Sequence, residues 1–328
     1  MNDIKLKYRK TLNKIGVTLL AFTVFIEVFM TVYSFADMIM AETVGGIVTE
    51  VASSILYDVA YLAAFMLPAI IMALMCGGNM QPFRFEPKYS LSTFALIATG
   101  VACVFSFSFI NSIAVSFLPI GDMEDLFFPS YSADYSLVLQ FITIAIVPAF
   151  CEEFLFRGVI LSNLMPYGKS TAIVISALCF GLMHGNFMQF LYATAAGIVL
   201  GVVYVKTESI WPSTFIHLIN NALSILQLAV FERMTESAAN TLWLTVDCLI
   251  FAFGVIGVII LVKKYKTTDK SCKPVFGKPL DNCYEGREGA LGGHVGIDQK
   301  DAVRLFFAPA MIAFIAICIG KACLFFFV

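Results

Sequence analysis

Charged residues are scarce in this chain. Asp, Glu, Lys and Arg make up 13% of its 328 residues, whereas hydrophobic residues make up 59%. Ordinary soluble domains carry about 25% charged residues. So little charge excludes a soluble globular enzyme and indicates an integral membrane protein. The net charge of −2 offers no basis for attracting nucleic acid, so we expect no nucleic-acid partner.

Short segments of alternating polarity, which mark outer-membrane barrels, are missing as well. Continuous apolar stretches of about 20 residues, the length that crosses a bilayer as a helix, occur instead. We therefore expect an all-α protein, a polytopic transmembrane helical bundle of about eight to nine membrane helices, forming a single integral membrane domain over residues 1–328. The candidate windows are 15–35, 55–76, 91–118, 137–164, 170–185, 187–205, 209–230, 242–262 and 305–326.

Lys and Arg are nearly absent from every second connection between these windows. With the amino terminus inside, 19 of the 21 Lys and Arg fall on the inner side, Arg157 included, and only Arg233 and Lys321 do not. Because cytoplasmic loops are enriched in these residues, we predict a plasma-membrane protein with a cytoplasmic amino terminus. Its basic face would contact anionic membrane lipid. The polar stretch 263–304 is expected to be a cytoplasmic loop before a last membrane helix.

Ionisable residues inside the apolar windows are few, and the whole chain has only three histidines. Such groups are costly within a membrane and usually face a partner or a wet cavity, so each is a candidate functional residue. Glu27, Asp58 and Asp247 are isolated in sequence. We interpret these three as structural, in hydrogen bonds between helices or near an interface.

One window contains a cluster of charges, in the stretch CEEFLFRG from 151 to 158. Glu153 and Arg157 are four residues apart, the spacing at which helical side chains meet, so they can neutralise each other. Glu152 points about 100° away around the helix and needs a partner from elsewhere. Pro148 leaves a carbonyl unpaired near this cluster, where a kink can admit water.

Two of the three histidines lie in later windows and can supply that partner. Phe180 and His184 occur in CFGLMHGN, and His217 and Asn221 occur in STFIHLINNAL, each pair at i,i+4 spacing. A lone membrane histidine more often makes a structural hydrogen bond. Two histidines, an amide and a pair of glutamates on neighbouring helices favour a functional site instead.

These residues resemble the three motifs of the CAAX prenyl protease and bacteriocin-processing family, also called the Abi family, of intramembrane endopeptidases. The matching motifs are Glu152-Glu153-x-x-x-Arg157, Phe180-x-x-x-His184 and His217-x-x-x-Asn221. Each motif alone is weak, but all three in order on successive membrane helices are specific. The resemblance covers about 150–225, and we expect the helices that carry the motifs to span 137–225.

The resemblance implies an enzyme that hydrolyses a peptide bond of a membrane-associated peptide or a lipidated protein tail. Glu152 would be the general base and His184 would help to hold the water, while His217 and Asn221 would line the oxyanion side. The implied supporting residues are Glu153, Arg157 and Phe180.

A metal-dependent variant would use the same residues, with Glu152, His184 and His217 holding Zn²⁺ beside an open water position. The chain lacks a His-Glu-x-x-His motif, and asparagine is an uncommon zinc ligand. We therefore favour a glutamate mechanism that requires no cofactor and keep zinc as the alternative.

Two other functions are alternatives from the sequence. A non-proteolytic membrane scaffold or bacteriocin self-immunity protein would use the polar cluster structurally, although it has no need to keep Glu152 without a local partner. A proton-coupled transporter would need a polar path across the bilayer. Neither such a path nor a pair of mirrored halves, common in transporter folds, is visible in the sequence.

Overall fold

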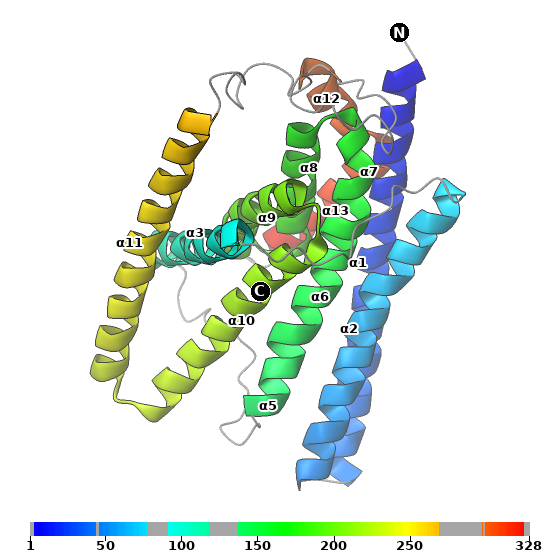
Figure 1. Ribbon diagram of the computed structural model, residues 1–328. Helices are drawn as coiled ribbons and strands as arrows, with labels where there is room; N and C mark the ends of the chain where they lie inside the picture. Colours follow the sequence, from blue (N-terminus) through cyan, green and yellow to red (C-terminus); the bar gives the residue numbers. More distant parts are fainter. Residues whose placement is uncertain are drawn as a thin grey trace.

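The computed structural model describes residues 3–43, 46–77, 91–117, 137–268, 297 and 299–324, and all regular structure in these ranges is helical (Figure 1). The predicted all-α, polytopic bundle is therefore confirmed. The first helices are α1 (Asp3–Thr43), α2 (Gly46–Cys76) and α3 (Leu91–Ser116). The later ones are α8 (Lys169–Met183), α9 (Phe187–Thr207), α10 (Ile210–Arg233), α11 (Glu236–Thr268), α12 (Gln299–Phe306) and α13 (Pro309–Leu324).

Between α3 and α8 runs one continuous helical rod that changes its hydrogen-bonding pattern several times. Its parts are α5 (Leu137–Gln140), the π-helix η1 (Phe141–Ile146), α6 (Val147–Glu153), the π-helix η2 (Phe154–Leu161), α7 (Ser162–Leu164) and the 3₁₀ turn η3 (Met165–Tyr167). A π-helix inside an α-helix marks a local distortion of the backbone and is frequent at functional sites.

Seven helices in the described ranges are long and apolar enough to cross a membrane, or eight if the bent pair α12 and α13 counts as one span. The window 170–185 forms the 15-residue helix α8. At 1.5 Å per residue α8 is about 22 Å long, shorter than a hydrocarbon core of about 30 Å. The window 305–326 is divided by a 68° bend before Pro309, because proline lacks an N–H and disfavours helix at the preceding residue.

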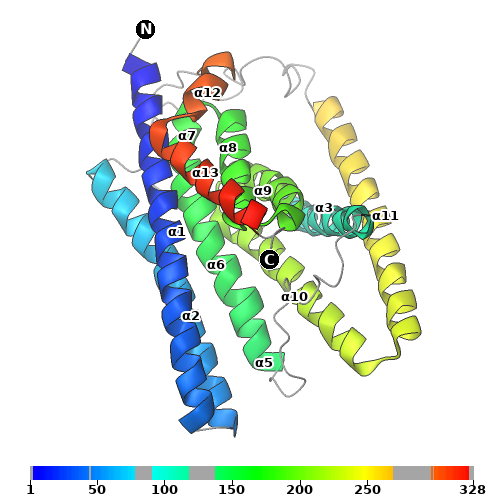
Figure 2. The ribbon, with the colours of Figure 1, turned by 180° about the vertical axis from the view of Figure 1, so that it is seen from behind.

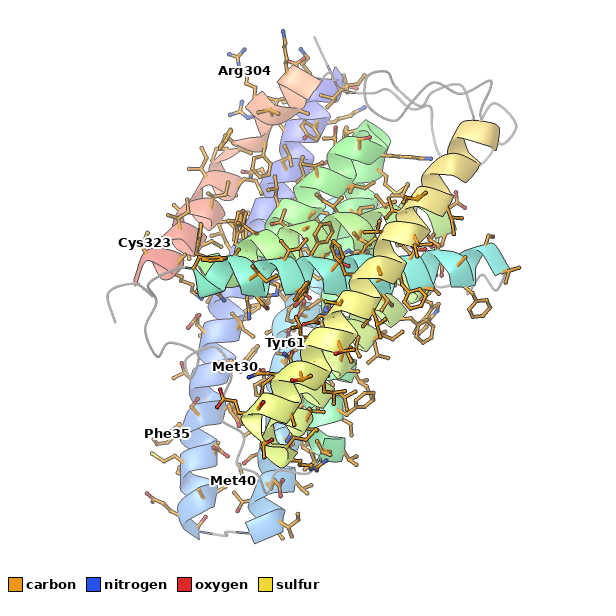
Figure 3. The ribbon with its side chains drawn as sticks, turned by 90° about the vertical axis from the view of Figure 1, so that its left-hand side faces the viewer. Met30, Phe35, Met40, Tyr61, Arg304 and Cys323 are labelled. Carbon is orange, nitrogen blue, oxygen red and sulfur yellow. The ribbon has the colours of Figure 1, made fainter. Side chains whose placement is uncertain are left out.

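The rod packs at the centre of the bundle, with the α1–α2 hairpin on one side and α8, α9 and α10 on the other (Figure 1). Figure 2 shows α13 running obliquely beside α1 and α8. Figure 3 shows α3 lying across the bundle, where it packs against α9, α10 and α11. Gly254 and Gly257 of α11 allow this crossing, since a Cβ at Gly257 would lie 2.8 Å from the Thr99 side chain.

Helix ends that the sequence assigns to one side of the membrane lie at one end of the bundle. The amino terminus of α1, α12 and the carboxyl end of α11 lie together at the top of Figure 1, whereas the α1–α2 and α10–α11 turns lie at the bottom. Lys5 forms an ion pair with Asp301, and the backbone N–H of Ile297 donates to the Tyr167 carbonyl at 3.1 Å. The start of α1, η3 and α12 are thereby joined.

Two charges inside membrane windows pair with each other. Glu27 of α1 accepts from Lys321 of α13, in agreement with a structural interpretation of Glu27. Of the predicted loop 263–304, residues 263–268 continue α11 and residues 299–304 belong to α12. The part of this prediction that falls on 269–296 and on 298 lies outside the described residues.

Candidate active site

Pro148 lies in α6, with a π-helix before and after it. In η1 the N–H of Val147 bonds to the carbonyl of Ile142, five residues back, and in η2 the N–H of Ser162 bonds to that of Arg157. In a regular α-helix the carbonyl of Ile144 would accept from residue 148, but proline has no N–H to donate. The altered helical pattern therefore surrounds the residue that cannot complete the α-helical ladder.

Asn221 of α10 donates from Nδ2 to this Ile144 carbonyl at 3.2 Å. Its Oδ1 accepts from Nδ2 of Asn220 at 3.3 Å. A side-chain amide nitrogen carries two N–H groups, so one of them stays available after the bond to Ile144. The sequence motif predicts Asn221 as a site residue but not this contact with the backbone beside Pro148.

Glu153 and Arg157 form the ion pair that their spacing predicts. Arg157 Nη1 lies 2.6 Å from Glu153 Oε1, and neither side chain has any exposed surface. Arg157 Nη2 also donates to the carbonyl of Gly197 in α9 at 3.2 Å, and its guanidinium lies 4.6 Å from the centre of the Phe180 ring. A buried charge needs this kind of pairing, because desolvation otherwise costs several kcal/mol or more.

His217 of α10 lies between the two glutamates. Its Nδ1 is 3.2 Å from Glu153 Oε1, and its Nε2 is 3.8 Å from Glu152 Oε2. Because an ionised carboxylate only accepts hydrogen bonds, Nδ1 carries the proton shared with Glu153. This bond fixes the orientation of the ring and directs Nε2 toward Glu152.

Glu152 is held by a residue that the sequence motifs do not include. The hydroxyl of Tyr61, in α2, donates to Glu152 Oε1 at 2.6 Å. The other oxygen, Oε2, is buried with no hydrogen-bond partner among the described residues, and it faces His217 Nε2. Glu152 was predicted to need a partner from another helix. Tyr61 is that partner for Oε1, and His217 lies near Oε2.

His184 is the residue after the end of α8, at the helix cap. Its Nδ1 is 2.8 Å from the Phe180 carbonyl, which can only accept, so Nδ1 carries the proton and Nε2 keeps its lone pair. The rings of His184 and His217 both meet the Phe180 ring edge to face, with centroids 5.1 and 5.8 Å away. No hydrogen bond or ion pair described in the structure joins His184 to Glu152.

The predicted residues therefore converge from the rod, α8 and α10, but to different degrees. Polar contacts connect Glu152, Glu153, Arg157 and His217, and Phe180 places His184 beside them. Phe180 is also packed from behind by Phe156 of η2, whose ring centroid is 5.2 Å away. Asn221 is connected to the same region by its hydrogen bond to the Ile144 carbonyl in η1.

A zinc ion would need three of these side chains close together. Within the described ranges, no three His, Cys, Asp or Glu side chains come close enough together to hold one. Glu152 and His217 face each other, but no described hydrogen bond or ion pair joins His184 to either. As placed, these three residues do not form a zinc ligand set.

Residues 134–223 match the family described as "Type II CAAX prenyl endopeptidase Rce1-like". All three motifs of the sequence lie within this segment. The Rce1-like segment includes the rod, α8, α9 and the first part of α10, so the resemblance predicted from the motifs is confirmed over the elements that build the site. The α1–α2 hairpin, with Tyr61, lies outside it.

A protein of Bacillus subtilis (strain 168), described as "Putative membrane peptidase YdiL", is 31% identical to this chain over 115 residues. The matched part is 34% of this chain and 46% of that protein, so the similarity spans less than half of the relative's length. No solved structure matches the chain.

Proposed function

We propose that this protein is an intramembrane endopeptidase that hydrolyses a peptide bond with water activated by Glu152. The proposed substrate is a membrane-associated peptide or a lipidated protein tail. The Rce1-like match and the relative named as a membrane peptidase support a membrane protease. The observation that carries the proposal is the buried, unpartnered Oε2 of Glu152, which faces His217 Nε2 while its other oxygen is held.

In the proposed reaction Glu152 Oε2 takes a proton from a water molecule. The resulting hydroxide attacks the carbonyl carbon of the scissile bond, and a tetrahedral oxyanion forms. The protonated Glu152 then transfers that proton to the leaving nitrogen as the C–N bond breaks. A carboxylate can serve as base and then as acid in this way, because giving the proton to the leaving nitrogen returns Glu152 to its ionised form for the next turnover.

The surrounding residues have separate tasks in this proposal. His184 Nε2, whose lone pair is free, accepts a hydrogen bond from the water and helps to hold it. His217 donates from Nε2 to the oxyanion when both of its nitrogens carry protons, which also neutralises the cluster of Glu152, Glu153 and Arg157. Asn221 can donate its second N–H on the same side. Donors of this kind stabilise developing charge most strongly where water is excluded.

Cysteine nucleophiles are not part of the proposal. Cys151 and Cys179 are close to the motifs in sequence, but both are completely buried. A thiolate is the reactive form of cysteine, and it is hard to generate in apolar surroundings. The proposed chemistry therefore relies on water rather than on an acyl-enzyme.

The test is cleavage of a peptide library, including lipidated tails, by the purified protein in detergent or nanodiscs. Glu152→Gln keeps the side-chain shape but removes the base, and we expect the cleavage rate to fall about 10²- to 10⁴-fold. His184→Ala and His217→Ala should each lower it by a similar order. Glu27→Gln, which changes a membrane carboxylate outside the cluster, is the matched control and should stay within about twofold.

Three outcomes would contradict the proposal. Normal cleavage by Glu152→Gln would exclude Glu152 as the base. Loss of wild-type cleavage on treatment with a chelator, restored by zinc, would replace the metal-free mechanism with a metal-dependent one. Binding of a peptide with no cleavage by any preparation would favour the scaffold alternative.

A further inference from the structure

Tyr61 reaches the candidate active site from outside the matched segment. It belongs to α2, 91 residues before Glu152 in the sequence, and its position in the bundle is marked in Figure 3. Its ring stacks on Tyr57 and Phe65, with centroids 5.9 and 4.8 Å away. Phe65 in turn packs against Phe22 of α1 at 4.7 Å. Aromatic contacts with both neighbours in the stack thus fix the direction of the Tyr61 hydroxyl.

The bond from Tyr61 to Glu152 is a strong one by its length. At 2.6 Å it lies in the range of O–H···O bonds to an ionised acceptor, which are about twice as strong as bonds between neutral groups. It also distinguishes the two oxygens of the carboxylate. Oε1 is occupied by the tyrosine, and Oε2 is left toward His217 Nε2.

We propose that Tyr61 is a positioning residue for Glu152. This inference rests on the proposed function of Glu152 as the base. By holding Oε1, Tyr61 prevents rotation of the carboxylate and keeps Oε2 on the side where water is activated. The hold persists after proton transfer, because the carbonyl oxygen of a neutral carboxyl group still accepts from a hydroxyl. The protonated Glu152 therefore keeps the orientation needed to deliver its proton to the leaving nitrogen.

A purely structural role, in which Tyr61 bonds to Glu152 only to satisfy its buried hydroxyl, leads to a different expectation. In that case the loss of the hydroxyl would affect stability and leave the chemical step unchanged. A positioning role predicts an effect on kcat that is separate from substrate binding. The α1–α2 hairpin would then contribute to catalysis through Tyr61, in addition to packing against the Rce1-like segment.

The experiment compares Tyr61→Phe with wild type on the library peptide that wild type cuts fastest. Tyr61→Phe keeps the stacked ring and removes only the hydroxyl. We expect kcat to fall about 10- to 100-fold, the loss of one hydrogen bond to a charged group, with KM within about twofold. Tyr57→Phe removes a hydroxyl from the same stack and is the matched control, with kcat expected within about twofold of wild type. A kcat for Tyr61→Phe equal to or above that of wild type would overturn the inference.

A second measurement tests the contact between Tyr61 and Glu152 independently of peptide cleavage. The Tm of Tyr61→Phe, Glu152→Leu and the double variant is measured in detergent, which needs no substrate. Groups in direct contact give non-additive effects, so we expect the double variant to deviate from the sum by more than about 2 °C. Additive shifts would mean that the contact is absent and would overturn the inference, whether or not the wild type cleaves peptides. If the shifts are coupled but wild type cuts nothing, the proposed function fails while the contact stands.

Discussion

Each charged side chain of the buried cluster has its own arrangement of partners. Glu153 accepts from both Arg157 and His217, and Arg157 also donates to the Gly197 carbonyl. Removing one partner of such a pair typically costs about 3–5 kcal/mol, because the other charge is left buried without compensation. Each glutamate has one buried oxygen, Oε2, with no hydrogen-bond partner among the described residues, but Glu152 has no ion pair with an arginine or lysine there: its Oε1 accepts from the Tyr61 hydroxyl and its Oε2 faces His217 Nε2. The ion pair with Arg157 makes Glu153 the structural carboxylate, and its absence leaves Glu152 as the candidate catalytic one.

Asn221 has a backbone contact that predicts an effect on stability in addition to any catalytic role. In Asn221→Ala the Ile144 carbonyl loses its side-chain donor, and a buried polar group without its partner costs about 1–3 kcal/mol. We expect a Tm lower by several degrees, measured by thermal unfolding in detergent.

Adding Pro148→Ala should recover at least half of that loss, because alanine supplies the N–H that an α-helix directs to Ile144. Pro148→Ala alone is the control. A normal Tm for Asn221→Ala combined with a loss of kcat would show instead that Asn221 acts only on the reacting atoms.

At the scale of elements, the short helix α8 places His184 at its end rather than in its middle. Gly185 follows with φ +66°, a left-handed conformation that glycine adopts without strain, and Asn186 then caps α9 by accepting from the N–H of Gln189. A helix end within a membrane is tolerated only where protein surrounds the backbone. The close crossing of α8 and α9 provides this protection.

Gly181 is the residue on which this crossing depends. A Cβ at position 181 would lie 2.7 Å from the Phe190 carbonyl oxygen and 2.1 Å from the Thr194 hydroxyl, so backbone would have to move. We expect Gly181→Ala to push α8 away from α9 and to displace His184. The Tm should fall, and the cleavage rate should drop about tenfold or more, since a displacement near 1 Å in an active site can lower a rate about 10²-fold.

Gly320→Ala in α13 is the matched control, because a Cβ there meets nothing within 4 Å. It should keep wild-type cleavage and Tm. Equal behaviour of the two variants would contradict the close packing of α8 on α9.

At the scale of the whole molecule, the site draws on more of the chain than the matched family segment. The Rce1-like match begins at residue 134, yet the described contact to Glu152 Oε1 comes from α2. The same packing joins the amino terminus of α1 to α12 through Lys5 and Asp301. Contacts between sequence-distant segments thus build the site and hold the amino terminus of α1 against α12.

Membrane sidedness can be tested by single cysteines and a membrane-impermeant maleimide, after replacement of the exposed native cysteines. Asp3→Cys and Gln299→Cys should be labelled only in inverted vesicles, and Thr43→Cys and Arg233→Cys only in intact cells, because positive charge favours the cytoplasmic side. Labelling of positions 3 and 299 from opposite sides would contradict the packing of α12 on α1. Labelling of both from outside would keep that packing and reverse the predicted orientation.

Properties that depend on composition and local spacing could be predicted from the sequence. Apolar length determines that these segments become membrane helices, and the i,i+4 spacing of Glu153 and Arg157 determines that they pair within one helix. The window 170–185 was already short for a full span, but apolar length did not show that His184 ends α8 or that the last window is bent. Those features depend on caps and proline within apolar runs, which hydropathy does not register.

The sequence by itself determined a helical membrane protein with an acid, two histidines and an amide in ordered motifs. Only the tertiary structure decided that Tyr61 holds Glu152, that His217 lies between two carboxylates and that Asn221 satisfies the backbone near Pro148. The physical reason is that contacts within a helix follow its fixed period of 3.6 residues, whereas contacts between helices depend on how they cross. No spacing in the chain encodes a hydrogen bond between residues 91 positions apart.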